Sequence, residues 1–220
     1  MRSLALIFFP LALVAQDRYI WRDKTANVCP LLDQRGASPY HPTYSWSWKS
    51  GTEFIPPEKR QDVSAFTVVD ESGAKISLKE LKGKPVIIGL WSTHCEPSLF
   101  LLSEMAQLYG RAGKFGFEMF PTNYDREQWT TITPFVNQKQ IQPLLQGVKI
   151  FTPELGWNGV HLFMDVVPAL PTFFVIDRDG RLAIQSFGFT AGELSKCIKV
   201  ILAETSRAAP LQGPTVTPPQ

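Results

Sequence analysis

The amino-acid sequence predicts an α/β fold in which helices flank a mixed central β-sheet. One observation is an apolar run of strand length at residues 86–91, followed by helically spaced apolar residues at 97–109 and a second strand pattern at 115–120. The other is a pair of β-prone runs, 172–176 and 182–187, on either side of a tight turn. A βαβ unit followed by a hairpin requires both parallel and antiparallel neighbours in one sheet.

Three further segments complete the predicted domain, which spans residues 63–204. Residues 64–69 alternate and predict a strand, 127–140 predict a helix, and 191–204 predict an amphipathic closing helix. Residues 86–91 are apolar without alternation, which is typical of a central strand that is covered on both faces.

The composition supports a folded domain and excludes some partner classes. The chain has 220 residues, of which 44% are hydrophobic and 19% charged, so it can fill a core. Its net charge of +2 gives no basic surface for nucleic acid. No apolar run is long enough for a membrane-spanning helix in the mature chain.

The two ends of the chain differ from the domain between them. Arg2 followed by an apolar run to Ala15 predicts a signal peptide over residues 1–15 and export to the bacterial periplasm or another extracytoplasmic space; a buried strand or core helix is the alternative. Residues 16–62 predict an irregular, aromatic-rich arm that packs on the domain or forms a binding surface. Residues 205–220 are proline-rich and predict a disordered tail.

The residues that could take part in a reaction lie where the strand at 86–91 meets the following helix. Cys95 is at or just before the helix N-terminus, where unpaired backbone N–H groups and the helix dipole favour a thiolate. Pro97 suits the first helical turn. His94 adds positive potential when protonated, and Ser98 can donate a hydrogen bond to the Cys95 sulfur. We therefore expect Cys95 to be a nucleophile that is assisted by Ser98 and His94.

These residues resemble a motif of the thioredoxin superfamily, in particular the exported thiol-disulfide oxidoreductases of the TlpA/ResA type, or redoxins. The sequence Leu-Trp-Ser-Thr-His-Cys-Glu-Pro-Ser at 90–98 is similar to the strand end and Cys-x-Pro-Cys helix start of that family, and Leu-Pro-Thr-Phe-Phe-Val-Ile-Asp at 170–177 is similar to its cis-proline strand. The resemblance covers residues 63–204. It implies a thioredoxin-like three-layer sandwich that acts on protein or small-molecule thiols and disulfides.

The resemblance also implies a groove for a substrate. A cis bond between Leu170 and Pro171 would lie beside the Cys95 sulfur and leave the Leu170 backbone available to an extended peptide. An ordinary trans proline at the start of an edge strand is the alternative. We expect Trp91, Leu170, Pro171 and Thr172 to bind substrate, with no cofactor and no metal.

The chain departs from the family motif at Ser98, which stands where the second cysteine would be. A mixed disulfide at Cys95 would then wait for a thiol from elsewhere. This departure favours a monothiol oxidoreductase, with an inactive binding module as the alternative. A peroxiredoxin-like peroxidase is a minor alternative, because Ser92 fits the peroxiredoxin pattern and Ile88 replaces its proline.

The remaining thiols and imidazoles have less specific predictions. Cys197 lies among apolar residues of the closing helix and predicts a buried structural cysteine. Cys29, in the arm, is either free or a resolving partner for Cys95. Three histidines could join Cys95 in a copper site, namely His41, His94 and His161, but no Cys-x-x-x-Cys pair accompanies them. The oligomeric state is not predicted.

Overall fold

The computed structural model describes residues 29–30, 51–125, 129–145, 147–155, 160, 163, 169–188 and 190–207. Its strands are β1 (Cys29–Pro30), β2 (Gly51–Phe54), β3 (Thr67–Val69), β4 (Lys75–Ser77), β5 (Val86–Trp91), β6 (Glu118–Asn123), β7 (Thr152–Pro153), β8 (Ala169–Leu170), β9 (Thr172–Ile176) and β10 (Leu182–Phe187). Its helices are α1 (Ser98–Phe115), α2 (Trp129–Val136), α3 (Gln142–Leu145) and α5 (Glu193–Arg207), with short 3₁₀ helices η1 (Pro57–Lys59) and η2 (Leu78–Leu81).

The central sheet has five strands in the order β2-β10-β9-β5-β6. β5 and β6 are parallel, and the other neighbouring pairs are antiparallel. Every residue of β5 is buried, because strands lie on both sides and other elements cover both faces. The sheet is therefore mixed, with the apolar strand at its interior as the sequence predicts.

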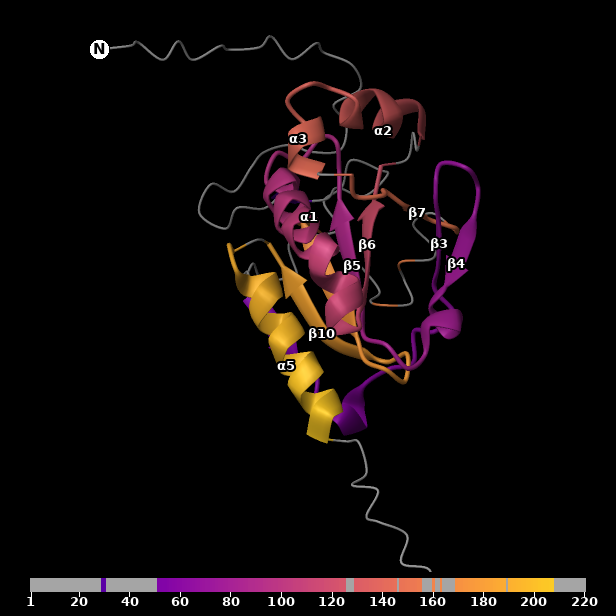
Figure 1. Cartoon of the computed structure of the whole chain (residues 1–220), viewed down its shortest axis with the longest axis vertical. Helices are drawn as coiled ribbons and strands as arrows, with labels where there is room; N and C mark the ends of the chain where they lie inside the picture. Colours follow the sequence, from indigo (N-terminus) through magenta and orange to yellow (C-terminus); the bar gives the residue numbers. More distant parts are fainter. Residues whose placement is uncertain are drawn as a thin grey trace, which may run out of the picture.

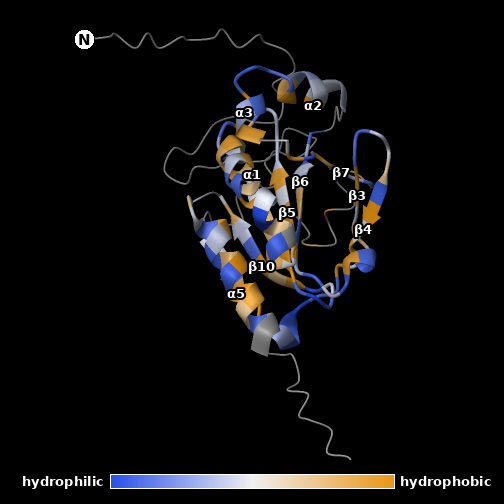
Figure 2. Cartoon of the chain, viewed as in Figure 1, coloured by the Kyte–Doolittle hydropathy of each residue, from blue (hydrophilic) through white to orange (hydrophobic). Residues whose placement is uncertain are grey.

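Helices α1 and α5 lie together over one face of this sheet (Figure 1). The alternate residues Ile87 of β5 and Phe173 and Val175 of β9 point to this side, where they form one cluster with Met105 of α1 and Ile198 of α5. Figure 2 shows that α5 carries hydrophobic and hydrophilic stretches on different sides, as a helix that covers a sheet must.

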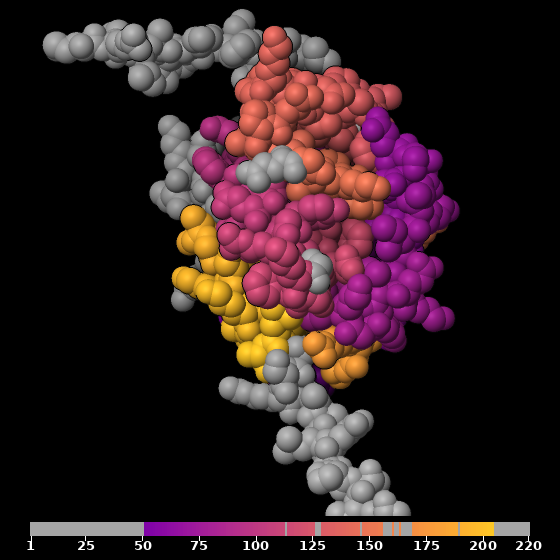
Figure 3. Space-filling model, in the orientation of Figure 1, coloured from indigo at the N-terminus to yellow at the C-terminus, as the bar shows by residue number. Residues whose placement is uncertain are grey.

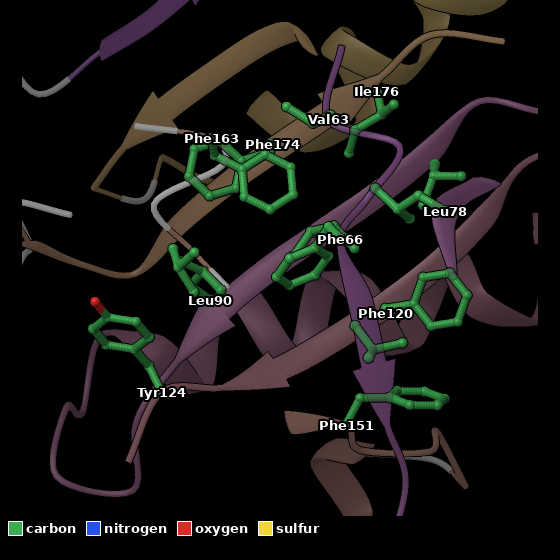
Figure 4. Close-up of a cluster of buried hydrophobic side chains, with 14 of the residues drawn as sticks. Val63, Phe66, Leu78, Leu90, Phe120, Tyr124, Phe151, Phe163, Phe174 and Ile176 are labelled. Carbon is green, nitrogen blue, oxygen red and sulfur yellow. The ribbon is translucent and has the colours of Figure 1, made fainter. Parts of the chain in front are cut away.

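The opposite face of the sheet is covered by a small antiparallel sheet, in the order β4-β3-β7, and by Phe163. Phe163 stacks on Phe174 of β9, with ring centroids 4.6 Å apart, and meets Phe66 edge-on at 4.7 Å (Figure 4). Cys95 is part of this same buried cluster. The loop that holds Cys95 between β5 and α1 is therefore anchored in the core that lies under β3.

A third cluster closes the end of the sheet where β5 finishes. Trp91 packs there with Leu102 of α1, Ile132 of α2 and Leu145 of α3. In the space-filling view the surface of segment 129–150 adjoins that of the β3–β4 hairpin (Figure 3). This segment adds short helices between β6 and β7, where the sequence predicted one helix over 127–140.

Most predicted elements are present, with two differences near the ends of the domain. β2 falls within the segment predicted to be an irregular arm, yet it pairs with β10 along the edge of the central sheet. α5 continues to Arg207, past the predicted boundary at residue 204. The predictions for residues 1–15, for most of the arm and for the tail after α5 lie outside the described residues. Within those residues, no helix combines the length and apolarity that crossing a membrane requires.

Candidate functional site

The loop between β5 and α1 holds Cys95 in a series of tight turns. The Cys95 N–H donates to the Ser92 carbonyl at 3.2 Å, and the Ser98 N–H donates to the Cys95 carbonyl at 2.9 Å. Pro97 precedes the helix with helical backbone angles, φ −55° and ψ −25°. Cys95 therefore lies just before α1, as its sequence position predicted, in a turn whose backbone groups bond to one another.

The Cys95 sulfur lies against the cis-proline segment. Its Sγ is 3.5 Å from the carbonyl oxygen of Leu170, and the Leu170–Pro171 peptide bond is cis. Cys95 is 1% exposed and Leu170 is fully buried. The Thr172 hydroxyl donates to the Ala169 carbonyl at 2.7 Å, across the cis bond. Two segments separated by 75 residues thus meet at one sulfur atom.

Cys95 and Cys197 are in different chemical states. Cys95 is disulfide-bonded, whereas Cys197 is a free, buried thiol in α5. Burial, and then the nearby charge of Glu193, raise the pKa of the Cys197 thiol to about 11. At neutral pH Cys197 is therefore held as an unreactive thiol, which agrees with the structural role that the sequence predicted.

The other predicted site residues occupy distinct positions around the loop. His94 is exposed, and its backbone N–H donates to the Ser92 hydroxyl at 3.0 Å. Ser98 is fully buried, and its hydroxyl oxygen accepts the Ser92 N–H at 3.4 Å. Because that contact uses only the oxygen, the Ser98 hydrogen can still be donated to a neighbour.

Trp91, which the sequence analysis expects to bind substrate, is enclosed by neighbouring side chains. It is fully buried and packs on Phe135, with ring centroids 6.0 Å apart. Alternation along β5 sends its side chain to the opposite side from Leu90, which lies in the cluster of Cys95. Trp91 therefore supports the end of the strand from which the loop departs.

Asp125 is a buried site residue that the sequence analysis missed. Its carboxylate accepts hydrogen bonds from the Ser92 hydroxyl, the Thr93 N–H at 2.8 Å and the Asn123 side-chain amide at 3.1 Å. It is 6% exposed. Asp125 follows β6, which is parallel to β5, so the carboxyl ends of both strands meet at one edge of the sheet. That topology, together with a polar run after an apolar strand, could have identified it.

The backbone edge beside the cis bond is itself paired with another strand. β1 runs antiparallel to β8, with Cys29 opposite Leu170 and Pro30 opposite Ala169. The edge that the resemblance assigned to a peptide substrate is therefore paired with residues of this chain. Cys29 shares a register position with the residue whose carbonyl touches the Cys95 sulfur.

A separate cleft of about 740 Å³ lies between the β3–β4 turn and segment 129–150. Its lining includes Asp70, Trp129, Asn137 and Lys149 and none of the predicted site residues. Across the described part of the chain, no three His, Cys, Asp or Glu side chains are grouped in a way that could hold a metal ion. His41 and His161 lie outside those residues.

Comparison with known proteins agrees with this geometry. Residues 60–185 match the AhpC/TSA family. The chain is 34% identical over 141 residues to the thiol-disulfide oxidoreductase ResA of Bacillus thuringiensis, an alignment that covers 61% of this chain and 75% of the relative. It is 36% identical over 121 residues to ResA of Bacillus subtilis, covering 55% and 63%.

Solved structures show the same fold. A putative thiol:disulfide interchange protein DsbE from Chlorobium tepidum superposes with a TM-score of 0.54 at 20% identity, covering 65% of this chain and 96% of that one. A DsbF homologue from Corynebacterium diphtheriae superposes with a TM-score of 0.53 at 23% identity, covering 71% and 96%. The predicted thioredoxin-like architecture is therefore confirmed.

Proposed function

Because the chain belongs to the AhpC/TSA family and is an oxidoreductase of the thiol-disulfide type, we propose that Cys95 is its nucleophile and that it acts through mixed disulfides. The contact that carries the proposal is the 3.5 Å approach of the Cys95 sulfur to the Leu170 carbonyl, next to Pro171. This approach supports the proposal, because the resemblance implies that the nucleophilic sulfur lies beside Pro171. We further propose, from residues 1–15, that the protein is exported.

The proposed reaction begins with Cys95 reduced. Its thiolate attacks one sulfur of a substrate disulfide; a Cys95–substrate disulfide forms, the substrate S–S bond breaks, and the other substrate sulfur leaves as a thiolate. A second thiol must then attack Cys95 to release the reduced substrate. Ser98 cannot supply that thiol, so within the Cys-Glu-Pro-Ser motif the chemistry stops at the mixed disulfide.

Each neighbouring residue has a role in this scheme. The Ser98 hydroxyl, buried at the first residue of α1, donates to the Cys95 thiolate. His94, exposed beside it, adds positive potential when protonated and so favours the thiolate. Leu170, Pro171 and Thr172 hold the backbone edge on which an extended protein or peptide disulfide would bind.

The test is the reaction of the reduced protein with glutathione disulfide, followed by mass spectrometry of its peptides. We expect a glutathione adduct or a new protein disulfide on the peptide that contains Cys95. Cys95→Ser should abolish it, and the control Cys197→Ala should leave it unchanged. Equal reaction of the Cys95→Ser protein would contradict the assignment.

The same measurement separates the alternatives. A protein that binds a peptide disulfide without forming any adduct would be a binding module. Faster oxidation of Cys95 by hydrogen peroxide than by any disulfide, with sulfenic acid as the product, would favour the peroxidase.

A further inference from the structure

The arm strand β1 lies at a position from which a second thiol could complete the Cys95 site. In an antiparallel pair, residues directly opposite one another have Cα atoms roughly 4.5–5.5 Å apart. Cys29 is opposite Leu170, and the Leu170 carbonyl oxygen is 3.5 Å from the Cys95 sulfur. The backbone register therefore brings Cys29 to the neighbourhood of Cys95, although 66 positions separate them in the sequence.

We propose that Cys29 is the resolving thiol of Cys95, so that the redox pair is supplied by the arm and not by the helix motif. This inference rests on the proposed function of Cys95. A disulfide needs Cα atoms roughly 4.4–6.8 Å apart. Cys29 and Cys95 both lie next to Leu170, a placement that is compatible with such a separation.

The state of the other two cysteines agrees with the assignment. Cys95 is disulfide-bonded and Cys197 is free. The chain has three cysteines, so the proposal assigns Cys29 as the partner of Cys95. Cys197 belongs to the cluster under α5, on the other face of the central sheet from Cys95.

The proposed resolution step begins from the mixed disulfide at Cys95. After a substrate sulfur has become bonded to Cys95, the Cys29 thiolate attacks the Cys95 sulfur. The Cys29–Cys95 disulfide forms, the Cys95–substrate bond breaks, and the substrate leaves as a thiolate. The substrate disulfide has then gained two electrons and the protein dithiol has lost them. An external dithiol reductant returns the protein to its reduced state.

This assignment also bears on when the groove can bind a substrate. Cys29 and Pro30 pair with the same two residues, Ala169 and Leu170, that an extended substrate would use. While β1 is paired there, the same edge cannot pair with a peptide, so the proposal assigns peptide binding to the reduced protein.

The experiment counts thiolate release from Ellman's reagent, 5,5′-dithiobis(2-nitrobenzoate), with the reduced full-length protein under native conditions. We expect the wild-type protein to release two equivalents of thionitrobenzoate in the fast phase and to retain no adduct, because Cys29 displaces the group from Cys95. Cys29→Ser should release one equivalent and keep a stable adduct on Cys95. Loss of the intramolecular attack should slow the second release by at least about a hundredfold.

Two controls accompany it. Cys197→Ala should behave like the wild type. The double variant Cys29→Ser with Ser98→Cys places a resolving thiol back in the helix motif and should recover the second release. Peptide mapping of the oxidised wild-type protein should find Cys29 joined to Cys95.

The outcomes distinguish a failure of the resolving role of Cys29 from a failure of the proposed function of Cys95. If the wild type releases one equivalent and keeps the adduct on Cys95, Cys29 is not the resolving thiol, while Cys95 remains the nucleophile. If the wild type has no fast phase, the proposed function itself is wrong. Should Cys29→Ser fail to fold, the peptide map of the wild type still decides, since a Cys95 that is joined to anything other than Cys29 overturns the inference.

Discussion

Replacing Asp125 with alanine should destabilise the protein and slow Cys95, because this carboxylate holds the reactive loop to the end of β6. The substitution leaves three donors without their acceptor: the Ser92 hydroxyl, the Thr93 N–H and the Asn123 amide. Ser92 and Asn123 are fully buried, and Thr93 is half-buried. None of the three therefore gains full hydration in exchange.

The magnitude follows from that count. A buried donor left without a partner costs about 1–3 kcal/mol, and the half-buried Thr93 N–H costs less because water can reach it, so we expect a total of roughly 3–5 kcal/mol. Asp125→Asn keeps one acceptor oxygen but turns an NH₂ group toward a donor, and should cost about 1–3 kcal/mol. The loss should appear in the midpoint of urea unfolding with little change in its slope.

The matched control is Asp62→Asn. Asp62 is exposed and accepts the Ser64 N–H at 2.8 Å, so its loss should cost less than about 1 kcal/mol. The second readout is the rate at which reduced Cys95 reacts with Ellman's reagent, which should fall in the Asp125 variants and stay constant in Asp62→Asn. A stability of Asp125→Ala equal to that of Asp62→Asn would refute the view that this carboxylate fixes the loop.

Two further predictions concern the core between the central sheet and helices α1 and α5. The thiol of Cys197 has its pKa raised to about 11 from 9.0, so iodoacetamide should modify it slowly at neutral pH. Between pH 9 and 11 the free energy of unfolding should fall more steeply than in Cys197→Ala, because in this range the Cys197 thiol ionises mainly in the unfolded state. Gly89→Ala should lower the free energy of unfolding in urea by about 1–3 kcal/mol, because its new Cβ would overlap the Met105 sulfur and lie 2.9 Å from Met105 Cε. Gly110→Ala, which has open space around it in α1, should raise that free energy by about 0.5–1 kcal/mol. Equal effects at the two glycines would contradict the packing argument.

The sequence predicted the central elements because their signals are local. The apolar run that became β5, and the hairpin of β9 and β10, depend on burial and turn residues within a few positions. The meeting of Cys95 with Pro171 came from resemblance to a family, because no local signal joins residues that lie on separate strands. Helix α1 runs to Phe115, beyond the predicted end at 109, because Gly110 is accepted within it.

The parts that could not be predicted depend on pairings between distant segments. β2 has few apolar residues and exposed side chains, so its place at the sheet edge is set by hydrogen bonds to β10 and by the Gln185–Glu53 contact at 2.5 Å. Asp125 reads as a loop carboxylate until the parallel pairing of β5 and β6 brings it to Ser92. Trp91 looked available at a strand end, but the segment that buries it follows some 40 residues later.

The strand β1 that pairs with the cis-proline segment contains a proline, and this favours turnover. Pro30 lies opposite Ala169, and proline has no N–H, so β1 has one potential backbone donor fewer here than an ordinary peptide has. Once the disulfide is reduced, nothing covalent holds the arm at Leu170, and an extended substrate with an N–H at that position pairs better. In the proposed scheme β1 pairs with this edge in the oxidised protein, and a peptide competes with β1 for the edge once the thiols are reduced. In a Pro30→Ala protein we therefore expect β1 to compete more strongly with peptide disulfides for the groove.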